Sequence, residues 1–512
     1  METSRPWSLA GLAAGLAGLA TSYAVAMALT VRESPVVAVA EVVIQHLPGP
    51  LVDRAIDYLG AFDKPVLVLV IVLVLAGLFA WAGRLARRSW WAPAVVFAVL
   101  AAIGAAAVVA QRNQQPVDFV PVAAGLVTWL VCLSLLTEPL RRARPEQGAA
   151  GRDESLAHTR RVFLVRAGLV AGAAVVVGAV GRVVGSGRRR VEQARGLLKL
   201  TGVTAPRVPP AARVGVEGVS PWMTPTDDFY QIHAGIGVPV IEPKDWSLRV
   251  HGMVDRELVL SYADLVEREF TEAWVTLACV SNEVGGDLIG NAWWSGVRVA
   301  DLLAEAGVQE GADAVKQTSD DGWTCGTPLA ALTDDRNALL AVAMNGRPLP
   351  IDHGFPVRTV VPGLYGYVSA TKWVVDLEVT RFEDFEAFWT TKGWAELGPV
   401  KMSSRIDVPR SGDDLEAGEV RIAGVAWAQH TGIESVEVSV DGGAWQRTEL
   451  ARTPSVDTWV QWALTTTLEP GDHVLRVRAT DLDGAVQTGA VSETVPDGAT
   501  GWHEVEVSVS DG

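Results

Sequence analysis

Two short runs rich in glycine and proline decide the fold of the middle of this chain: Met344-Asn345-Gly346-Arg347-Pro348-Leu349-Pro350, then His353-Gly354-Phe355-Pro356-Val357-Arg358. They lie inside a globular pattern that begins near Val219 and continues to about Glu396. Short apolar segments of β type alternate there with helical segments, and turns that contain Gly and Pro separate them. The strand segments include 246–250 and 274–277, and the helical ones include 262–269 and 299–306. This mixture predicts an α+β domain over residues 219–400.

Beyond residue 400 the hydrophobic pattern changes to alternation between apolar and polar residues. The alternating segments are 420–427, 433–440, 456–464, 474–479 and 505–509. Turn signals such as Asp441-Gly442-Gly443 separate them. Short strands at this spacing, without helices, predict an all-β, immunoglobulin-like sandwich over residues 401–512.

The first part of the chain has a different composition. The chain has 512 residues, a mean hydropathy of +0.23 and a formal net charge of −16. Residues 1–200 carry 21 Lys and Arg against 12 Asp and Glu, whereas the rest carries 22 against 47. An apolar, basic first part excludes a wholly soluble protein, and the acidic second part argues against nucleic-acid binding. Three cysteines are too few for a disulfide scaffold or a four-cysteine metal site.

Five apolar windows are long enough to cross a bilayer as helices. They are 7–29, 65–83, 91–110, 119–137 and 162–184. With five spans, the connections rich in Arg fall on one side, which the positive-inside rule makes the cytoplasmic side. We therefore predict a multi-pass membrane region over residues 1–184 and a linker over 185–218. The parts that follow the linker are expected in the periplasm or outside the cell.

The run Thr159-Arg160-Arg161-Val162-Phe163-Leu164 immediately precedes the fifth apolar window. It resembles a twin-arginine signal, which exports proteins that have already folded. A basic cytoplasmic loop before a helix is the alternative interpretation. Export after folding suits a protein that takes up a cofactor in the cytoplasm.

The membrane region offers few groups for redox chemistry. Its only histidine before residue 158 is His46, in a predicted loop, so spans one to four cannot hold a haem between two histidines. We predict no haem in this chain. Cys132, in the fourth span, is expected to be a small packing residue.

Cys279 is the chief candidate for chemistry outside the membrane region. It ends a predicted strand and opens a loop that contains Gly285 and Gly286. A cysteine at such a strand end is well placed to direct a thiolate at a metal. Its position agrees equally with a buried thiol or with a disulfide to Cys325, which an exported compartment allows.

The runs around Cys279 resemble the sulfite oxidase family of molybdopterin enzymes. The similar runs, in the family's order, are Phe229-Tyr230-Gln231-Ile232-His233, Trp246 to Gly252, Thr276-Leu277-Ala278-Cys279, Trp294-Ser295-Gly296-Val297, the two runs quoted first, Val361-Pro362-Gly363 and Lys372-Trp373. The resemblance covers about residues 220–400. A dimerisation domain with a β-sandwich fold usually follows in this family, and residues 401–512 fit it.

The resemblance implies a molybdenum cofactor bound to molybdopterin and a role for each matching residue. Cys279 corresponds to the thiolate ligand of molybdenum. The residues expected around the pterin and its phosphate are Tyr230, His233, Ser319, Asp320, His353, Arg358, Ser369, Thr371 and Lys372. Arg can bind phosphate oxygens with a forked pair of donors, and Lys offers a point charge.

The chain departs from animal and plant sulfite oxidases at three positions expected in the substrate site. Gln231 and Val284 stand where the family has sulfite-contacting arginines, and Trp394 stands where it has the active-site tyrosine. Bringing an oxyanion out of water without cations around it is costly. Arg298 or Lys401 could supply the missing charge if the fold brings either one into the pocket.

These observations predict a membrane-anchored molybdopterin oxidoreductase that transfers an oxygen atom with two electrons on a small substrate, with Cys279, Gln231 and Trp394 at the catalytic centre. Oxidation and reduction of the substrate agree equally with the sequence. A sulfite oxidase with a rearranged anion pocket is one alternative, and a non-catalytic adhesion or assembly module that uses the sandwich is another. A separate electron-transfer partner and a homodimer through the sandwich are also expected.

Overall fold

The protein divides into two compact units in a computed structural model that describes residues 5–29, 31, 33–59, 62–111, 115–142, 152–184 and 187–511. The first unit comprises residues 1–193 together with Gly235–Val240, and the second comprises 194–234 and 241–512. The segment 143–151, which includes Arg144 of the predicted basic connection, lies outside the described residues.

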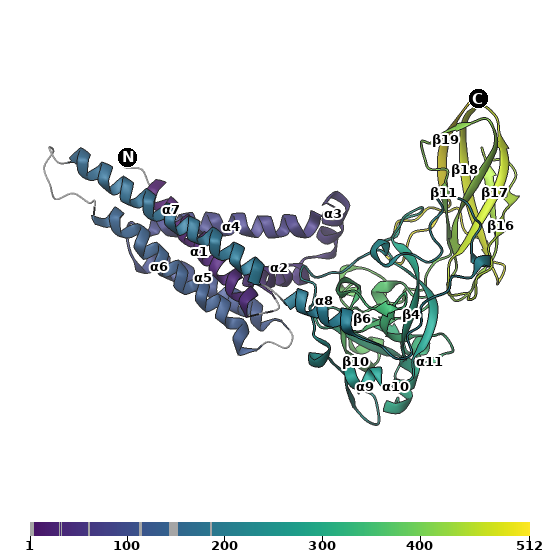
Figure 1. Ribbon diagram of the computed structural model, residues 1–512, viewed down its shortest axis with the longest axis horizontal. Coiled ribbons are helices and arrows are strands. Elements are labelled where there is room, and N and C mark those ends of the chain that lie inside the picture. The colour runs from purple at the N-terminus through teal and green to yellow at the C-terminus, as the bar shows by residue number, and fades with distance from the viewer. Residues whose placement is uncertain are drawn as a thin grey trace. The chain divides into compact units, whose positions relative to one another are not determined.

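The first unit is helical (Figure 1). Its helices are α1 (Arg5–Ala28), α2 (Pro35–His46), α3 (Gly49–Leu59), α4 (Asp63–Leu85), α5 (Trp91–Val109), α6 (Val120–Arg142) and α7 (Arg152–Val184). Among the described residues, five helical segments are long and apolar enough to cross a membrane, and they coincide with the five predicted windows. Helix α1 packs against α4, α6 and α7. Gly11 and Gly83 permit the close approach of α1 to α4, because a Cβ at Gly83 would lie 2.1 Å from the Trp7 carbonyl oxygen.

Helices α2 and α3 occupy the connection between the first two apolar windows, which was expected to be a loop. Helix α2 begins at Pro35, whose fixed φ angle suits the first turn of a helix, and it ends at His46 before Leu47 and Pro48. His46 is therefore helical rather than in a loop. At 12 residues, α2 is too short to span a bilayer.

The predicted linker, 185–218, is also more ordered than its composition suggested. It contains helix α8 (Gly187–Leu197), and its later part packs onto the second unit. Ala212 is fully buried, and the Arg452 N–H donates to the Ala211 carbonyl at 2.8 Å. Polar backbone groups of this segment thus find partners across the fold, which local composition does not reveal.

One mixed sheet, one antiparallel sheet and short helices form the first part of the second unit, in agreement with the predicted α+β class. One sheet has the order β2 (Leu258–Ser261), β1 (Ser247–Gly252), β10 (Val374–Thr380), β5 (Ala314–Ser319) and β6 (Thr324–Pro328), with β1 and β10 parallel. The other has the order β3 (Thr271–Ala278), β4 (Ile289–Arg298), β7 (Leu339–Met344) and β8 (Arg347–Pro348), and β9 (Arg358–Val360) pairs with β7. The helices are α9 (Tyr262–Val266), α10 (Val299–Ala306) and α11 (Leu329–Thr333).

Two further sheets form the C-terminal region. One has the order β11 (Ser403–Val408), β13 (Gly418–Trp427), β17 (Val460–Leu468) and β16 (Glu449–Leu450). The other has the order β12 (Asp414–Glu416), β19 (His503–Ser510), β18 (Gly471–Asp481), β14 (Ile433–Val440) and β15 (Gln446–Arg447). Inward residues of both sheets, including Ile422, Trp462, Val436 and Leu475, share one hydrophobic core. The region is therefore β-rich, as predicted.

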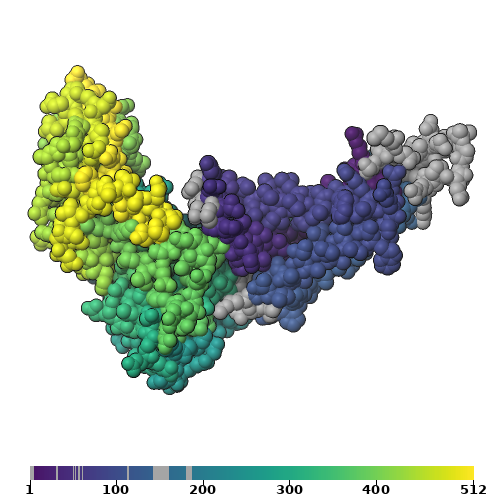
Figure 2. Space-filling view, turned by 180° about the vertical axis from the view of Figure 1, so that it is seen from behind, coloured from purple at the N-terminus to yellow at the C-terminus, as the bar shows by residue number. Residues whose placement is uncertain are grey.

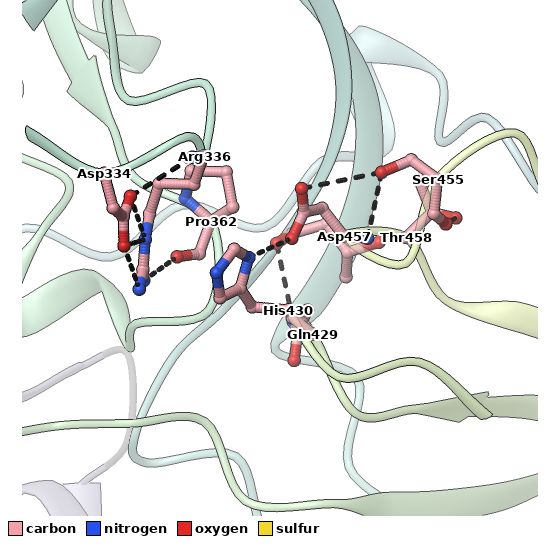
Figure 3. A network of polar contacts seen from close by, with 9 residues as sticks. Asp334, Arg336, Pro362, Gln429, His430, Ser455, Asp457 and Thr458 are labelled. Carbon is pink, nitrogen blue, oxygen red and sulfur yellow. Dashed lines mark hydrogen bonds and ion pairs between the residues drawn. The ribbon is translucent and has the colours of Figure 1, made fainter. Parts of the chain in front are cut away.

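The C-terminal sheets and the preceding α+β part are in continuous contact (Figure 2). A hydrogen bond crosses this boundary, from the Trp459 N–H to the Thr276 hydroxyl at 2.8 Å, and further polar pairs lie on either side of it. The Arg336 guanidinium pairs with Asp334 at 2.8 Å and donates to the Pro362 carbonyl at 2.8 Å, while His430 lies 3.2 Å from Asp457 (Figure 3). Gly363 adopts φ +80°, and a Cβ there would lie 2.9 Å from the His430 Cβ. This close approach explains the glycine in Val361-Pro362-Gly363 and fixes the next segment, which enters the site.

Candidate functional site

Cys279 lies at the end of β3, in the loop that connects β3 to β4. Its backbone N–H donates to the Leu288 carbonyl at 2.9 Å, so the strand pairing continues to the first loop residue. The Asn282 side chain then closes the loop by accepting the Leu288 N–H at 2.8 Å. Burial raises the pKa of the Cys279 thiol, whereas hydrogen bonds from Ser281 and the charge of Lys372 lower it. The loop therefore presents a fixed, half-buried sulfur with a cation nearby.

Three side chains converge on one side of the α+β part, those of His353, Arg358 and Lys372. Gly354 lies between them at φ +107°, and a Cβ there would lie 3.0 Å from the Arg358 Cβ and 3.1 Å from the Lys372 Cα. The Thr359 N–H donates to the Thr371 carbonyl at 2.9 Å, which ties β9 to the segment before Lys372. Only glycine fits at position 354, so the signature His-Gly-Phe-Pro brings these three cationic or titratable side chains together.

Ser319 and Asp320 join the same cluster through the pairing of β5 with β10. Ser319 pairs with Val374, and the Asp320 N–H donates to the Trp373 carbonyl at 2.8 Å. The His233 ring meets the Trp373 ring edge to face, with centroids 6.3 Å apart. The predicted pterin contacts from three distant parts of the chain thus surround Lys372 and Trp373.

Tyr230 and Phe229 connect the cluster to Cys279. Burial raises the pKa of the Tyr230 phenol, and the charges of Cys279 and Arg358 also act on it, so the phenol lies near both. The Phe229 ring meets the rings of His353 and Trp294 edge to face, each with centroids 5.8 Å apart. The cluster and the thiol therefore belong to one site.

Ser369 and Thr371 lie beneath the cluster and are fully buried. The Ser369 hydroxyl donates to the Tyr365 carbonyl at 2.8 Å, and the Thr371 hydroxyl contacts the Cys325 sulfur at 3.2 Å. Cys325 is a free, buried thiol whose pKa is raised by burial to about 12. Cys279 is free as well, so the structure does not contain the disulfide that the sequence left open.

The cluster contains buried polar groups that call for an anionic, hydrogen-bonding partner. The Arg358 side chain is only 4% exposed, and burial lowers its pKa to about 10. Its hydrogen bonds within the described chain are to the carbonyls of Thr359, His353 and Ala370, at 3.2 to 3.4 Å. His353 Nδ1 and Ser319 Oγ are buried and have no hydrogen-bond partner among the described residues.

A buried cation without an anion is strongly destabilising. A phosphate would satisfy the Arg358 guanidinium, and pterin nitrogens and oxygens would satisfy the histidine and the serine. Burial, with the nearby charges of Arg358 and Lys372, also lowers the pKa of His353 to about 4, so at neutral pH its ring is uncharged and can accept a hydrogen bond. The residues present therefore fit molybdopterin.

A small pocket of about 10 Å³, which is roughly the space for one water molecule, lies beside the Cys279 loop. It is lined by Ala278, Asn282, Glu283, Val284, Tyr365, Ser403, Trp427 and Ala499. These residues come from the Cys279 loop, from the segment after Val361-Pro362-Gly363, and from the C-terminal region. Both parts of the second unit therefore contribute to it.

The three residues expected in the substrate site have different positions in the fold. Val284 lines the pocket. Gln231 is exposed to solvent. Trp394 does not line the pocket but is buried, with its ring 5.9 Å from that of Tyr367 and 6.3 Å from that of Trp389. The catalytic roles of Gln231 and Trp394 remain predictions, and their positions do not favour direct contact with a substrate in this pocket.

Neither alternative cation replaces the missing arginines. The Lys401 ammonium pairs with Asp497 at 2.8 Å and donates to the Gly498 carbonyl at 2.8 Å. The Arg298 guanidinium contacts the Asp334 carbonyl at 3.5 Å, next to the domain boundary, and does not line the pocket. The pocket wall includes one carboxylate, Glu283, and no Lys or Arg.

Tyr365 is the pocket residue that the sequence interpretation missed. Its phenolic oxygen accepts the Lys401 backbone N–H at 3.3 Å, and a Cβ at Gly498 would lie 2.6 Å from it. Burial raises its pKa to about 12, with a contribution from Cys279. The sequence signal that could have identified Tyr365 is its position directly after Val361-Pro362-Gly363 and Leu364. The sequence does not show, however, that this segment turns toward Cys279.

Comparisons with known proteins concern the part of the chain that contains this site. Residues 235–389 match a family model described as the oxidoreductase molybdopterin binding domain. The chain is 37% identical to the uncharacterized oxidoreductase YuiH of Bacillus subtilis over 188 residues, which cover 36% of this chain and 91% of that protein. It is 32% identical to human mitochondrial sulfite oxidase over 344 residues, or 56% of this chain, and it spans 62% of that relative's length.

A solved structure, the sulfane dehydrogenase SoxCD from Paracoccus pantotrophus, also resembles the chain. The match has a TM-score of 0.46 at 24% identity, and it covers 57% of this chain and 79% of that one.

The buried guanidinium gives a direct test of the cofactor cradle. Replacing Arg358 by Met should weaken the affinity for the cofactor about a hundredfold, because losing one partner of a buried ionic contact costs about 3 kcal/mol. Less molybdenum and pterin should therefore remain bound after gel filtration. The cofactor-free variant should melt no lower than the cofactor-free parent, since the removed charge has no anionic partner there. Arg347→Met, at an exposed position of the same segment, is the matched control. Equal cofactor content in the Arg358 variant and the parent would contradict the assignment.

Proposed function

Because this chain belongs to the sulfite oxidase family of molybdopterin oxidoreductases, we propose that it is a membrane-anchored enzyme that exchanges an oxygen atom, with two electrons, on a small uncharged substrate. The family's members are molybdenum-dependent oxidoreductases, and the cofactor is molybdenum bound to molybdopterin. The observation that carries the proposal is the pocket beside Cys279, whose wall holds no cation.

The residues of this chain have distinct tasks in the proposed reaction. The bound cofactor supplies the two-electron redox change and the oxygen that is exchanged. The Cys279 thiolate is a soft ligand for its metal. Arg358 and Lys372 hold the phosphate of the pterin, and His353 and Ser319 hydrogen-bond to the ring system. Together these residues would hold the cofactor near the pocket.

Tyr365 is the group best placed to orient the substrate. Its oxygen already accepts the Lys401 N–H, so its own proton is available to donate into the pocket. A phenol with a raised pKa stays protonated at neutral pH and can bind a neutral oxygen, such as that of a sulfoxide or an N-oxide. Val284 and Trp427 supply apolar surface beside it. The pocket thus favours an uncharged oxide, or the corresponding reduced compound, over a dianion.

Membrane anchoring, location and assembly complete the proposal. Five apolar helices support anchoring, and the distribution of arginines supports a cytoplasmic N-terminus with the second unit outside. The C-terminal sheets follow the α+β part, which is the order expected if they form a dimerisation domain, and the mass of the purified enzyme in solution tests for a homodimer. Electrons would pass to or from a separate carrier protein.

The first test concerns Cys279. Cys279→Ser should abolish turnover and leave the far-ultraviolet circular dichroism and most of the pterin content unchanged, because a hydroxyl is a poorer ligand for a soft metal. Cys325→Ser, at a buried thiol outside the pocket, should retain turnover. Full activity of the Cys279 variant would contradict the proposal that Cys279 is the metal ligand of a molybdenum-dependent enzyme. Purified protein without molybdenum or pterin would favour an adhesion or assembly module.

The second test concerns substrate charge. The purified, molybdenum-replete protein should oxidise sulfite weakly, since each missing charged contact costs about 3 kcal/mol, or roughly a hundredfold in rate. Val284→Arg, alone or with Gln231→Arg, should raise kcat/KM for sulfite at least about tenfold and lower it for a neutral sulfoxide or its reduced product. Val259→Arg, at an exposed position outside the pocket, is the matched control. Efficient sulfite turnover by the unmodified enzyme would favour the alternative of a rearranged anion pocket.

The third test concerns export. Changing Arg160 and Arg161 together to Lys should leave the second unit in the cytoplasm if these residues act as a twin-arginine signal. Protease added outside spheroplasts should then fail to cleave it, whereas it cleaves the parent. The exposed pair Arg188 and Arg189, changed in the same way, provides the control for basic charge. Unchanged cleavage of the Arg160 and Arg161 variant would show that export uses another route.

A further inference from the structure

The helical unit contains a cavity that the redox function does not use. Its volume is about 290 Å³, and it lies where three chain segments meet at one end of the apolar helices. Trp7 comes from the first turn of α1, Ala86 to Trp90 form the connection between α4 and α5, and Arg141 lies in the last turn of α6. The cavity is thus formed within the first unit alone.

Close helix packing holds the walls of this cavity in place. The Arg84 Nε atom donates to the Ser8 hydroxyl at 2.8 Å and ties the end of α4 to the start of α1. Gly83 faces the Trp7 carbonyl at a distance that excludes any Cβ. The Arg141 guanidinium lies 5.3 Å from the centre of the Trp90 ring, which fixes its direction by a cation–π contact. The cavity is therefore a built feature of the helix contacts.

The charge of the cavity wall is strongly positive. Three arginines line it, Arg87, Arg88 and Arg141, together with Ser89, and all four residues are exposed to solvent. No carboxylate is present among its lining residues. Guanidinium groups bind phosphate through paired, parallel hydrogen bonds, so three of them around one hollow suit a phosphate group.

The place of the cavity identifies the source of that phosphate. It lies at the ends of apolar helices, and two tryptophans border it, as is typical of the interface between membrane and water. The basic connections place this end on the cytoplasmic side, where the surface is anionic. A basic pocket between helices at this depth meets lipid headgroups before any dissolved ion.

We propose that this cavity binds the phosphate of an anionic phospholipid in the cytoplasmic leaflet and so fixes α1, α4, α5 and α6 to the membrane. The ligand chemistry is a phosphate diester, and a lipid headgroup rather than dissolved phosphate is its source. The proposal depends on membrane insertion of the helices and not on the reaction at Cys279.

The test uses the full chain in a neutral detergent, with lipid added as phosphatidylglycerol or phosphatidylcholine, and with inorganic phosphate in a third arm. Native mass spectrometry counts retained lipid, and the melting temperature of the helical unit reports stabilisation. Phosphatidylglycerol should be retained and should raise the melting temperature, whereas the other two additions should not. An equal effect of phosphatidylcholine, or of inorganic phosphate, would overturn the proposed lipid headgroup site.

Substitutions in the cavity make the test specific. Each guanidinium near an anionic lipid surface contributes about fivefold in affinity, so Arg88→Gln with Arg141→Gln should weaken retention of phosphatidylglycerol about 25-fold. Arg54→Gln, at an exposed position of α3 outside the cavity, should leave retention unchanged. Molybdenum content and turnover should be unchanged in both variants, which separates this proposal from the redox function. Retention by the double variant equal to that of the parent would refute it.

Discussion

A buried guanidinium without an anionic partner is the constraint on which the site depends. Arg358 begins a short central strand, stacks over Trp294 at 5.1 Å, and has only carbonyl oxygens as hydrogen-bond partners in the described chain. Such a group is costly in a protein core unless a ligand completes it. The glycine at position 354, the pairing of Thr359 with Thr371 and the turn at Ser319 all place further donors around it. The fold thus reserves a place for an anionic cofactor, and this requirement explains the unusual density of glycine and proline there.

The pocket beside the Cys279 loop differs in charge from the cluster around Arg358. Positive groups gather around the cradle, whereas the pocket wall beside Cys279 has Val284, Tyr365 and Trp427 and the carboxylate of Glu283. Lys401, the nearest candidate for a replacement cation, is neutralised by Asp497. Under the proposed function, an intact cradle beside a pocket without a cation would keep the family's redox chemistry and favour a different substrate. This separation is physically reasonable, because the cradle is made by the α+β part and the pocket is completed by the C-terminal region.

In the helical unit, packing and charge act at different places along the helices. Glycine contacts bring α1 against α4, and aromatic rings of Phe79, Phe97 and Trp129 fill the space between the helices. The arginines lie at the helix ends, where their charge stays near water. Packing in the apolar part joins the helices, and under the proposed membrane anchoring the charge at the ends would set their depth and direction in a bilayer.

The sequence by itself determined the parts of this protein that depend on local pattern. Apolar length predicted the five long helices, alternation predicted the β-rich C-terminal region, and the ordered runs from Phe229 to Lys372 predicted the cofactor residues that the fold brings together. Only the tertiary structure showed that α2 and α8 are helices, that Gln231 faces solvent, and that Trp394 packs in the core while Tyr365 enters the pocket. It also decided the charge of the pocket, because Lys401 and Asp497 are far apart in the chain and meet only when the connection between β18 and β19 folds back. Hydrophobic period is a property of neighbours in sequence, whereas the pairing and burial of a charge depend on residues that packing brings from elsewhere.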